Sequence, residues 1–150
     1  MSLTLRLTIQ MTADEMWPLW PDIIGCLERY CARFPDETVE GVISQCAAGR
    51  RQLWVVIDEN GSVILTPITE IVKIDATGEF RLLLAQVGGK RLRECMPLLA
   101  EIEKWAAREY GAKESELIGR GRRGSSGWTR HLEPLGYEPV AVVYRKEIAA

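Results

Sequence analysis

The segment that follows "FRLLL", the mostly apolar run of residues 80–84, combines two glycines with basic residues, a pattern that can hold an anion. Its candidate binding residues are Val87, Gly88, Gly89, Lys90 and Arg91. Where a strand runs into a helix through glycines, backbone N–H groups can surround a phosphate and basic side chains can add positive charge. The sequence therefore predicts a phosphate-binding loop here. A turn that only leads the chain out of a strand is the other interpretation.

Two tryptophans and a second basic segment point to a protein partner. Trp17 and Trp20 lie beside Pro18 and Pro21. If both indoles are exposed they form an aromatic patch suited to a protein partner, and in the alternative one or both pack against a sheet. The glycine-, arginine- and serine-rich segment "GRGRRGSS" at 119–126 either contacts phosphate or an acidic protein surface, or is a solvated loop. Its arginines are Arg120, Arg122 and Arg123.

The composition is that of one globular domain over residues 1–150. A net charge of −2 gives no overall attraction to nucleic acid or to an anionic membrane. The single histidine and the absence of a C-x-x-C pair argue against a metal site. No apolar run approaches the roughly 20 residues that span a bilayer. We therefore expect a cytoplasmic protein without metal, without a membrane anchor and without a nucleic-acid partner.

The first half of the chain alternates between strand and helix patterns. Residues 3–9 alternate as a half-buried strand, and Thr12 and Glu15 have the spacing of a capping box at the start of a helical region. A second helix is expected in residues 34–50, with Asp36 as its cap. Two strands in residues 52–72 flank an Asn-Gly hairpin turn, and Pro67 predicts an edge or a bulge in the second of them.

The second half predicts a strand over 79–87 and a helix that ends at Gly111, with Pro97 near its first turn. A short strand over 114–120, a short helix over 127–137 and a last strand over 138–148 follow. The order is β-α-α-β-β-β-α-β-α-β. We therefore predict an α/β fold in which one mixed central sheet carries helices on both faces.

This order, the basic junction and the terminal "LGYEP…YRKEI" resemble the GNAT N-acetyltransferase fold over essentially the whole chain. More narrowly, "WVVIDENG", "IEKWAAREYGA" and "IGRGRRGSSGWTRHLEPLGYEPVAVVYRKEI" resemble GNAT-like proteins encoded by bacteriophages. The resemblance implies that acetyl-CoA is a candidate ligand of the basic junction. The phage resemblance implies a protein of the host cytoplasm or one incorporated in a virion.

The junction departs from the family motif, Arg/Gln-x-x-Gly-x-Gly/Ala, whose glycines let the backbone approach the diphosphate of acetyl-CoA. Aligning Leu98 and Leu99 with the family's leucine pair places Arg91 on the motif arginine. Glu94 and Met96 then stand where the family has glycines. A carboxylate repels phosphate, and a long side chain fills the space that the ligand needs.

The resemblance also implies where proton transfer would occur. The family's general base is usually a carboxylate on the central strands, and Glu70 and Glu79 are the candidates. The tyrosine that protonates the leaving thiolate in many members is replaced by Leu132, four residues before Gly136. His131 is next to that position and is the remaining catalytic candidate.

Two functions remain open at this point. In the first, the chain has lost catalysis, requires no cofactor and binds protein partners as a phage structural or assembly component of the head-tail or tail type. In the second, it is an acetyl-CoA-dependent N-acetyltransferase that acts on a primary amine. The replaced glycines and the missing tyrosine favour the first function, whereas the whole-chain resemblance and the basic junction favour the second.

Overall fold

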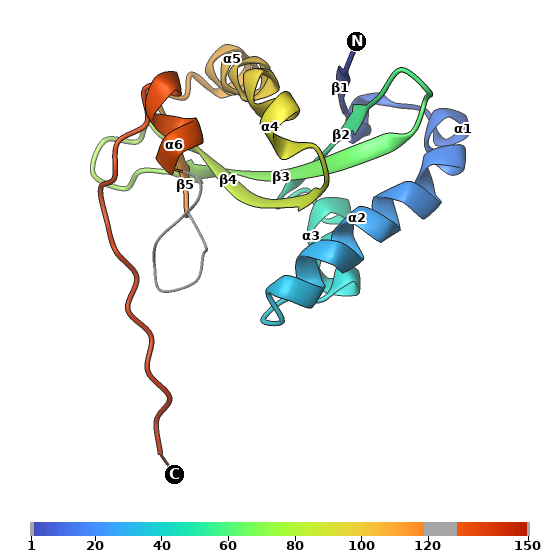
Figure 1. The fold of residues 1–150 in the computed structure, drawn as a ribbon. Coiled ribbons are helices and arrows are strands. Elements are labelled where there is room, and N and C mark those ends of the chain that lie inside the picture. Colours follow the sequence, from blue (N-terminus) through green and yellow to red (C-terminus); the bar gives the residue numbers. More distant parts are fainter. Residues whose placement is uncertain (1, 119–128, 150) are drawn as a thin grey trace. The chain divides into compact units, whose positions relative to one another are not determined.

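A five-stranded sheet organises the first part of the chain in the computed structural model (Figure 1). The structure describes residues 2–118 and 129–149. The chain forms two compact units, Met1–Leu117 and Ile118–Ala150, and each is described by itself. That residues 1–150 form a single domain stays a prediction.

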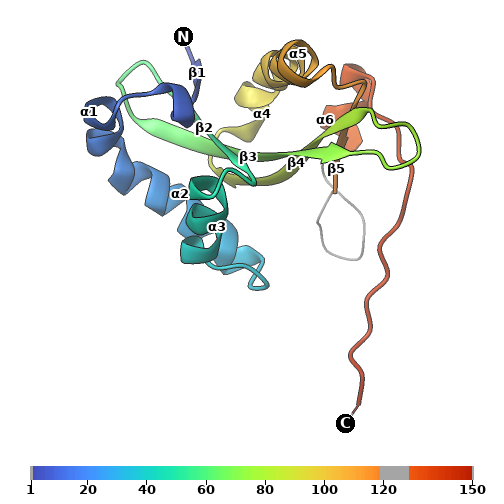
Figure 2. The same ribbon diagram turned by 180° about the vertical axis from the view of Figure 1, so that it is seen from behind.

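The strands of the first unit lie in the order β1-β2-β3-β4-β5. All neighbours are antiparallel except β4 and β5, which are parallel. Helices cover both faces of this mixed sheet, as Figures 1 and 2 show, and the predicted fold class is confirmed. The strands are β1 (Thr4–Leu7), β2 (Gln52–Ile57), β3 (Val63–Lys73), β4 (Phe80–Gly89) and β5 (Glu114–Leu117).

The turn between β2 and β3 forms where the sequence predicts it. Gly61 has a φ of 78°, a backbone conformation that favours glycine. The Asp58 carboxylate accepts hydrogen bonds from the backbone N–H groups of Asn60 and Ser62, at 2.9 and 3.0 Å. These bonds fix Asp58 and Glu59 at the end of the hairpin.

One face of the sheet is covered by the helices that follow β1. They are η1 (Thr8–Gln10), α1 (Ala13–Met16), η2 (Trp17–Leu19), α2 (Trp20–Arg33) and α3 (Val39–Ala47). The predicted capping box of Thr12 and Glu15 is confirmed at the start of α1. The prediction that Asp36 caps α3 is wrong, because the Thr38 hydroxyl accepts the Gly41 N–H at 3.0 Å and makes Thr38 the N-cap. The core of this face consists of Ile23, Cys26, Leu27, Val42, Leu53, Val55, Val63 and Ile68.

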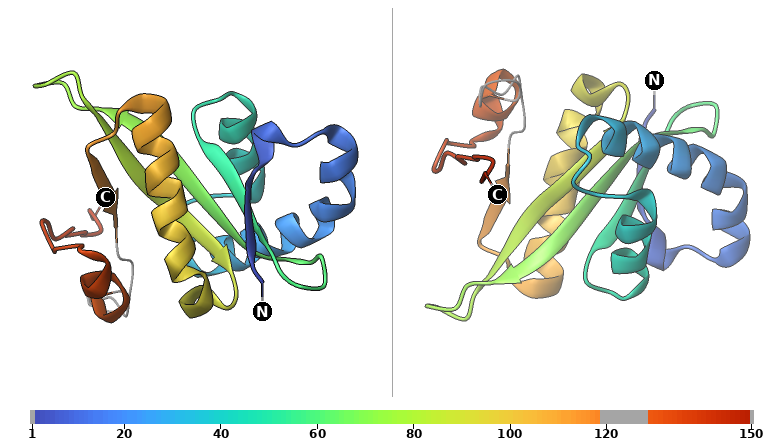
Figure 3. Two further views of the ribbon diagram at one scale, coloured as in Figure 1. Left: turned by 90° about the horizontal axis from the view of Figure 1, so that it is seen from above. Right: turned by 90° about the horizontal axis from the view of Figure 1, so that it is seen from below.

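The opposite face is covered by the helical segment after β4. As predicted, Pro97 lies near its start, since α4 (Leu92–Cys95) and η3 (Met96–Leu98) precede the long helix α5 (Leu99–Tyr110). Gly111 ends α5 with a φ of 65°. Trp105 of α5 meets Trp54 of β2 edge to face, with ring centroids 5.0 Å apart. Figure 3 shows α5 lying along β4, with β1 beside it.

Pro67 lies inside β3, which is a central strand and not an edge. Pro67 pairs with Val87 of β4 in regular register, and the pairing of the two strands becomes irregular one residue later, between Ile68 and Thr69. The predicted edge position is therefore wrong, and the bulge lies near Pro67 but in the neighbouring strand β4, not in β3 as the sequence predicts.

The C-terminal unit contains α6 (Thr129–Leu132) and η5 (Glu133–Leu135), and Gly136 ends η5 with a φ of 88°. The predicted last strand over 138–148 is wrong for this structure, because residues 138–149 form no regular secondary structure. Their alternating apolar residues favour a strand, but a strand also needs a hydrogen-bonded neighbour. Val140 and Tyr144 are 81% and 89% exposed.

Candidate active site at the bulge of β4

The centre of β4 contains a β-bulge beside an open strand edge. Ile68 pairs with Gln86, whereas the next residue of β3, Thr69, pairs with Leu84. Ala85 is therefore the extra residue of the bulge. On the other side of β4, β5 pairs only from Arg81 to Leu84. Within the described part of the first unit, β4 thus has no strand neighbour on that edge from residue 85 to residue 89.

Backbone groups of this open edge point away from β3. The N–H of Lys90 donates to the carbonyl of Ile64 at 2.8 Å, so the amide of Lys90 faces β3. Backbone amides alternate in direction along a strand, and three residues earlier the N–H and carbonyl of Val87 therefore face the open edge. An extended ligand can form strand-like hydrogen bonds there.

The bulge also decides which way Gln86 points. In an uninterrupted strand Gln86 would share a face with Leu82, which packs in the core below α5. The extra residue turns Gln86 to the face of Ile68, its partner in β3, where α2 and α3 pack. Gln86 is only 3% exposed there.

A cluster of four polar side chains, Glu37, Arg51, Glu70 and Gln86, occupies this face next to the bulge. Gln86 Nε2 donates to Glu37 Oε2, and Arg51 Nη1 donates to Glu37 Oε1 at 3.1 Å. Arg51 Nε lies 3.6 Å from Glu70 Oε2. Two buried atoms, Gln86 Oε1 and Arg51 Nε, have no hydrogen-bond partner among the described residues. The cluster therefore carries one net negative charge, one acceptor without a hydrogen bond, and one donor that has an ion pair at 3.6 Å but no hydrogen bond.

Gly88 and Gly89, predicted as part of a phosphate loop, are the last residues of β4. A Cβ on Gly88 would lie 2.4 Å from the carbonyl oxygen of Cys26 in α2. A Cβ on Gly89, where φ is 130°, would lie 2.2 Å from the carbonyl oxygen of Ile64 in β3. The glycines are thus required by close contacts with the protein's own backbone.

Arg91 lies at the N-terminus of α4 and its charge is neutralised by acidic residues. It has left-handed backbone angles, φ 58° and ψ 34°. Its guanidinium lies 2.7 Å from Glu94, 3.8 Å from Glu59 and 3.9 Å from Asp58. The hydrogen bond between Arg91 and Glu94 raises the pKa of the guanidinium and lowers the pKa of the carboxyl. The motif arginine is therefore held by internal ion pairs.

The other predicted site residues lie in several places. Val87 packs against the core below α4, and the backbone of Lys90 is bonded to β3 as described. Glu70 joins the polar cluster, whereas Glu79 is exposed in the turn between β3 and β4. His131 lies in α6 of the C-terminal unit.

The two tryptophans predicted as a partner patch differ in exposure. Trp17 is 79% exposed, whereas Trp20 packs against the core of α2 and α3. Met96, the other departure from the family motif, is buried in η3. The arginines at 120, 122 and 123 lie outside the described residues.

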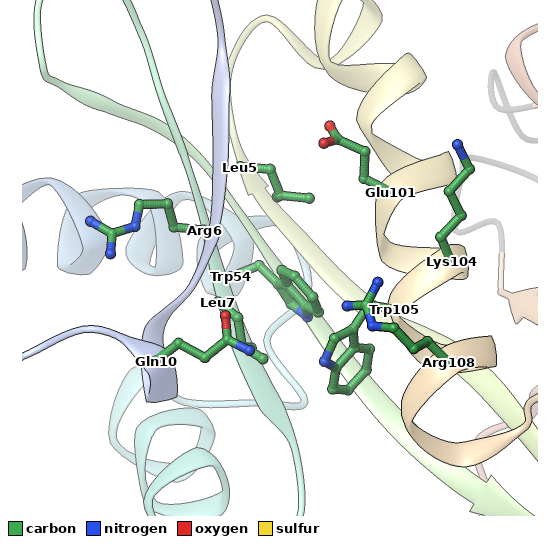
Figure 4. Close-up of a pocket in the computed structure, with 9 residues that line it drawn as sticks. All are labelled: Leu5, Arg6, Leu7, Gln10, Trp54, Glu101, Lys104, Trp105 and Arg108. Carbon is green, nitrogen blue, oxygen red and sulfur yellow. The ribbon is translucent and has the colours of Figure 1, made fainter.

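The sheet face below α5 has a separate hollow of about 400 Å³ between β1 and α5. Figure 4 shows Trp54 and Trp105 at its centre, with Lys104 and Arg108 on the side of α5. It contains none of the predicted site residues. Its lining is Leu5, Arg6, Leu7, Gln10, Trp54, Glu101, Lys104, Trp105 and Arg108.

Metal binding, membrane insertion and catalysis by a cysteine nucleophile have little support in the described part of the chain. No group of three or more potential metal ligands occurs in it, and none of its helices is long and apolar enough to cross a membrane. Burial raises the pKa of each cysteine thiol, that of Cys95 to about 11, which makes them poor nucleophiles at neutral pH.

Sequence analysis missed Glu37, Arg51 and Gln86 as functional residues. Gln86 stands within the apolar strand segment 79–87, and only the glutamine itself, a polar residue at a buried position, could have indicated a role. Glu37 and Arg51 stand in connections that carry no motif. They meet Gln86 only through the folded chain.

Comparison with known proteins identifies the fold. No family model matches the sequence, and no curated protein matches it. An aminoglycoside acetyltransferase from an uncultured soil metagenomic sample has a TM-score of 0.69 at 11% identity, with 99% of this chain and 100% of that chain covered. The ribosomal-protein-alanine N-acetyltransferase of Brucella melitensis has a TM-score of 0.66 at 12% identity, covering 98% and 100%.

A third similar structure is the aminoglycoside antibiotic 6'-N-acetyltransferase of Acinetobacter baumannii, with a TM-score of 0.63 at 14% identity over 99% and 100% of the two chains. Identities this low establish the fold alone. The resemblance to bacteriophage proteins finds no support in these similarities and stays a prediction. The chain has the fold of the GNAT N-acetyltransferases.

Proposed function

We propose that the protein is an N-acyltransferase that uses an acyl-CoA thioester and an amine acceptor. The observation that carries this proposal is the bulge at Ala85 beside the unpaired edge of β4. A folded chain normally covers or shortens an open edge, because unpaired backbone groups invite another strand. Here the edge lies beside the bulge and the polar cluster, and acetyltransferases have this fold.

The open edge fits the thioester arm of acetyl-CoA. The outward amide of Val87 can pair with the two amides of the pantetheine arm as it would with a neighbouring strand. Acetyl-CoA would supply the activated acyl group. Glu70 is the proposed proton acceptor for the amine, because its carboxylate is 3.6 Å from Arg51 and 35% exposed, whereas Glu37 is engaged by two donors.

The diphosphate end of acetyl-CoA fits less well. The glycines of the junction face the protein's own backbone, and Arg91 is surrounded by three carboxylates. Binding of a diphosphate here requires Arg91 to exchange at least one internal partner for the ligand. We therefore expect a weaker contribution from the phosphates than the family motif would give.

Thermal unfolding with and without about 1 mM acetyl-CoA tests the proposal. A Kd on the order of 10 μM stabilises the fold by about 2.7 kcal/mol, which corresponds to a rise in Tm of roughly 5–11 °C. Val87→Pro removes the outward N–H and leaves the hydrogen bonds to β3 in place, so it should abolish the shift. Val87→Ala, which keeps the N–H, is the matched control.

A second candidate is a GNAT-fold protein that binds a protein partner without catalysis. The neutralised Arg91 and the 79% exposed Trp17 favour it. No stabilisation by either acetyl-CoA or acetyl-pantetheine, together with no release of free CoA in the presence of amines, would establish this candidate over the enzyme. The role of a phage head-tail or tail component, predicted from the sequence, belongs to this second candidate.

A further inference from the structure

The polar cluster next to the bulge has features of a ligand site. Gln86 is 3% exposed, and its Oε1 is buried without a partner among the described residues. The orientation of its amide follows from charge, because Nε2 must face the Glu37 carboxylate and Oε1 must point elsewhere. A buried acceptor without a donor costs about 1–3 kcal/mol, so a bound group that supplies the donor is favoured.

The second atom of the cluster without a hydrogen bond is Arg51 Nε, which lies 3.6 Å from Glu70 Oε2 as an ion pair. Arg51 Nη1 and Gln86 Nε2 bind different oxygens of the same Glu37 carboxylate. The atoms without a hydrogen bond, Arg51 Nε and Gln86 Oε1, thus belong to the two groups that flank Glu37. A hydroxyl is the simplest ligand group that accepts one hydrogen bond and donates another, which is the pair of bonds that these two atoms lack.

The net negative charge of the cluster favours a cationic ligand group. Glu37 and Glu70 carry two negative charges against the one positive charge of Arg51. Their side chains are 23% and 35% exposed, so a ligand reaches the cluster through these carboxylates. An ammonium group has three donors and no acceptor, which suits two carboxylates.

We infer that this cluster binds an amine with a neighbouring hydroxyl, that is, an amino alcohol or amino sugar, as the acceptor of the acyl group. The ammonium pairs with Glu37 and Glu70, and the hydroxyl accepts from Arg51 Nε and donates to Gln86 Oε1. This inference rests on the proposed acyltransferase function, since it assigns the acceptor of that reaction. It places the acceptor beside the bulge on the face of α2 and α3.

The inference is tested by measuring the affinity of three matched probes by NMR titration or calorimetry, without any acyl donor. They are trans-2-aminocyclohexanol, cyclohexylamine and cyclohexanol. The amino alcohol should bind on the order of tenfold more tightly than either single-group probe, as expected for one further charge-assisted hydrogen bond. Equal binding of cyclohexylamine would overturn the role of the hydroxyl, and no binding of the amino alcohol would mean that water alone fills the cluster.

Three variants assign the site. Glu37→Gln should weaken the amino alcohol at least tenfold, whereas Glu40→Gln, which removes the same charge from an exposed position of α3, should not. Arg51→Lys keeps the charge but removes Nε, and should reduce the affinity for the amino alcohol to that of cyclohexylamine.

If Glu37→Gln does not fold, Glu70→Gln replaces it, with the same expected direction. Equal affinities of Glu37→Gln, Glu40→Gln and wild type overturn the assignment.

The two proposals fail separately in this design. Amino alcohol binding without stabilisation by acetyl-CoA contradicts the acyltransferase and leaves the cation site standing. Stabilisation by acetyl-CoA with no preference for the amino alcohol contradicts the acceptor assignment alone.

Discussion

Gly88 of β4 lies directly against the backbone of Cys26 in α2, so closely that a Cβ on the glycine would be 2.4 Å from the Cys26 carbonyl oxygen. The contact joins residues far apart in the sequence and sets how near α2 approaches the sheet. A side chain at this position forces the helix away from β4, on which it packs. The glycine is therefore a structural requirement, whatever the function of the junction.

Gly88→Ala should destabilise the protein by about 1–3 kcal/mol, the usual range for an overpacked core. The obstacle is backbone, which cannot rotate away as a side chain can. Urea unfolding measures the change. Gly25→Ala in α2 is the matched control, because nothing lies within 4 Å of its new Cβ, and alanine in a helix should stabilise by about 0.5–1 kcal/mol. Equal effects of the two substitutions would show that α2 does not approach β4 in this way.

The two glycines show what a sequence can and cannot reveal about a site. A glycine needed by a ligand and a glycine needed by a packed helix look the same in the sequence, because both avoid a Cβ for steric reasons. Only the position of Cys26 separates them. The same limit applies to the bulge: residues 82–87 form a mostly apolar run without strict alternation, so no change of period marks Ala85.

Sequence patterns formed by neighbouring residues predicted the structure better than features that depend on contacts between distant residues. The Asn-Gly turn, the capping box of Thr12 and the break near Pro97 depend on residues within a few positions of one another, and the structure confirms all three. The polar cluster depends on long-range contacts, with Glu37 and Gln86 separated by 49 residues. The last strand was predicted from apolar alternation alone, which does not specify a partner strand.

Thr69→Val should cost about 1–3 kcal/mol, because it leaves buried polar groups without partners. Thr69 is fully buried; its hydroxyl accepts from the Trp54 indole N–H at 2.9 Å and donates to Gln52 Oε1 at 2.8 Å. Thr66→Val is the control, since that equally buried hydroxyl makes one longer bond, 3.3 Å to the Gly88 carbonyl. Urea unfolding should show the larger loss for Thr69→Val, and the opposite order would contradict the assigned hydrogen bonds.

The capping box of α1 should make stability depend on pH at the acidic end. Hydrogen bonds from the Thr12 backbone N–H and then from Arg6 lower the pKa of Glu15 from 4.5 to about 2. A carboxyl with a lowered folded-state pKa stabilises the fold fully above its unfolded-state value, and this contribution is lost as the pH falls toward 2. The difference in stability between wild type and Glu15→Gln should therefore be constant above pH 5 and shrink between pH 4.5 and 2.

Thermal unfolding of both proteins at a series of pH values in constant salt measures this difference. Asp14→Asn, a neighbouring acidic residue in the first turn of α1, is the control. A difference between wild type and Glu15→Gln that stays the same down to pH 2 would contradict the low pKa of Glu15.

Glu94→Gln should increase the affinity for acetyl-CoA several-fold. Glu94 is the nearest of the three carboxylates around Arg91, at 2.7 Å, and the neutral amide removes this shortest ion pair, whereas those to Glu59 and Asp58 are longer. Arg91 then has more free charge for a phosphate, and one repulsive carboxylate is gone.

Acetyl-pantetheine lacks the phosphates, so its affinity should stay unchanged. Glu109→Gln, which removes an exposed acid paired with Arg108, controls for net charge. Isothermal titration of both ligands on the three proteins separates the outcomes, since an equal gain for acetyl-pantetheine would place the effect of Glu94 on the fold of the junction and not on phosphate binding.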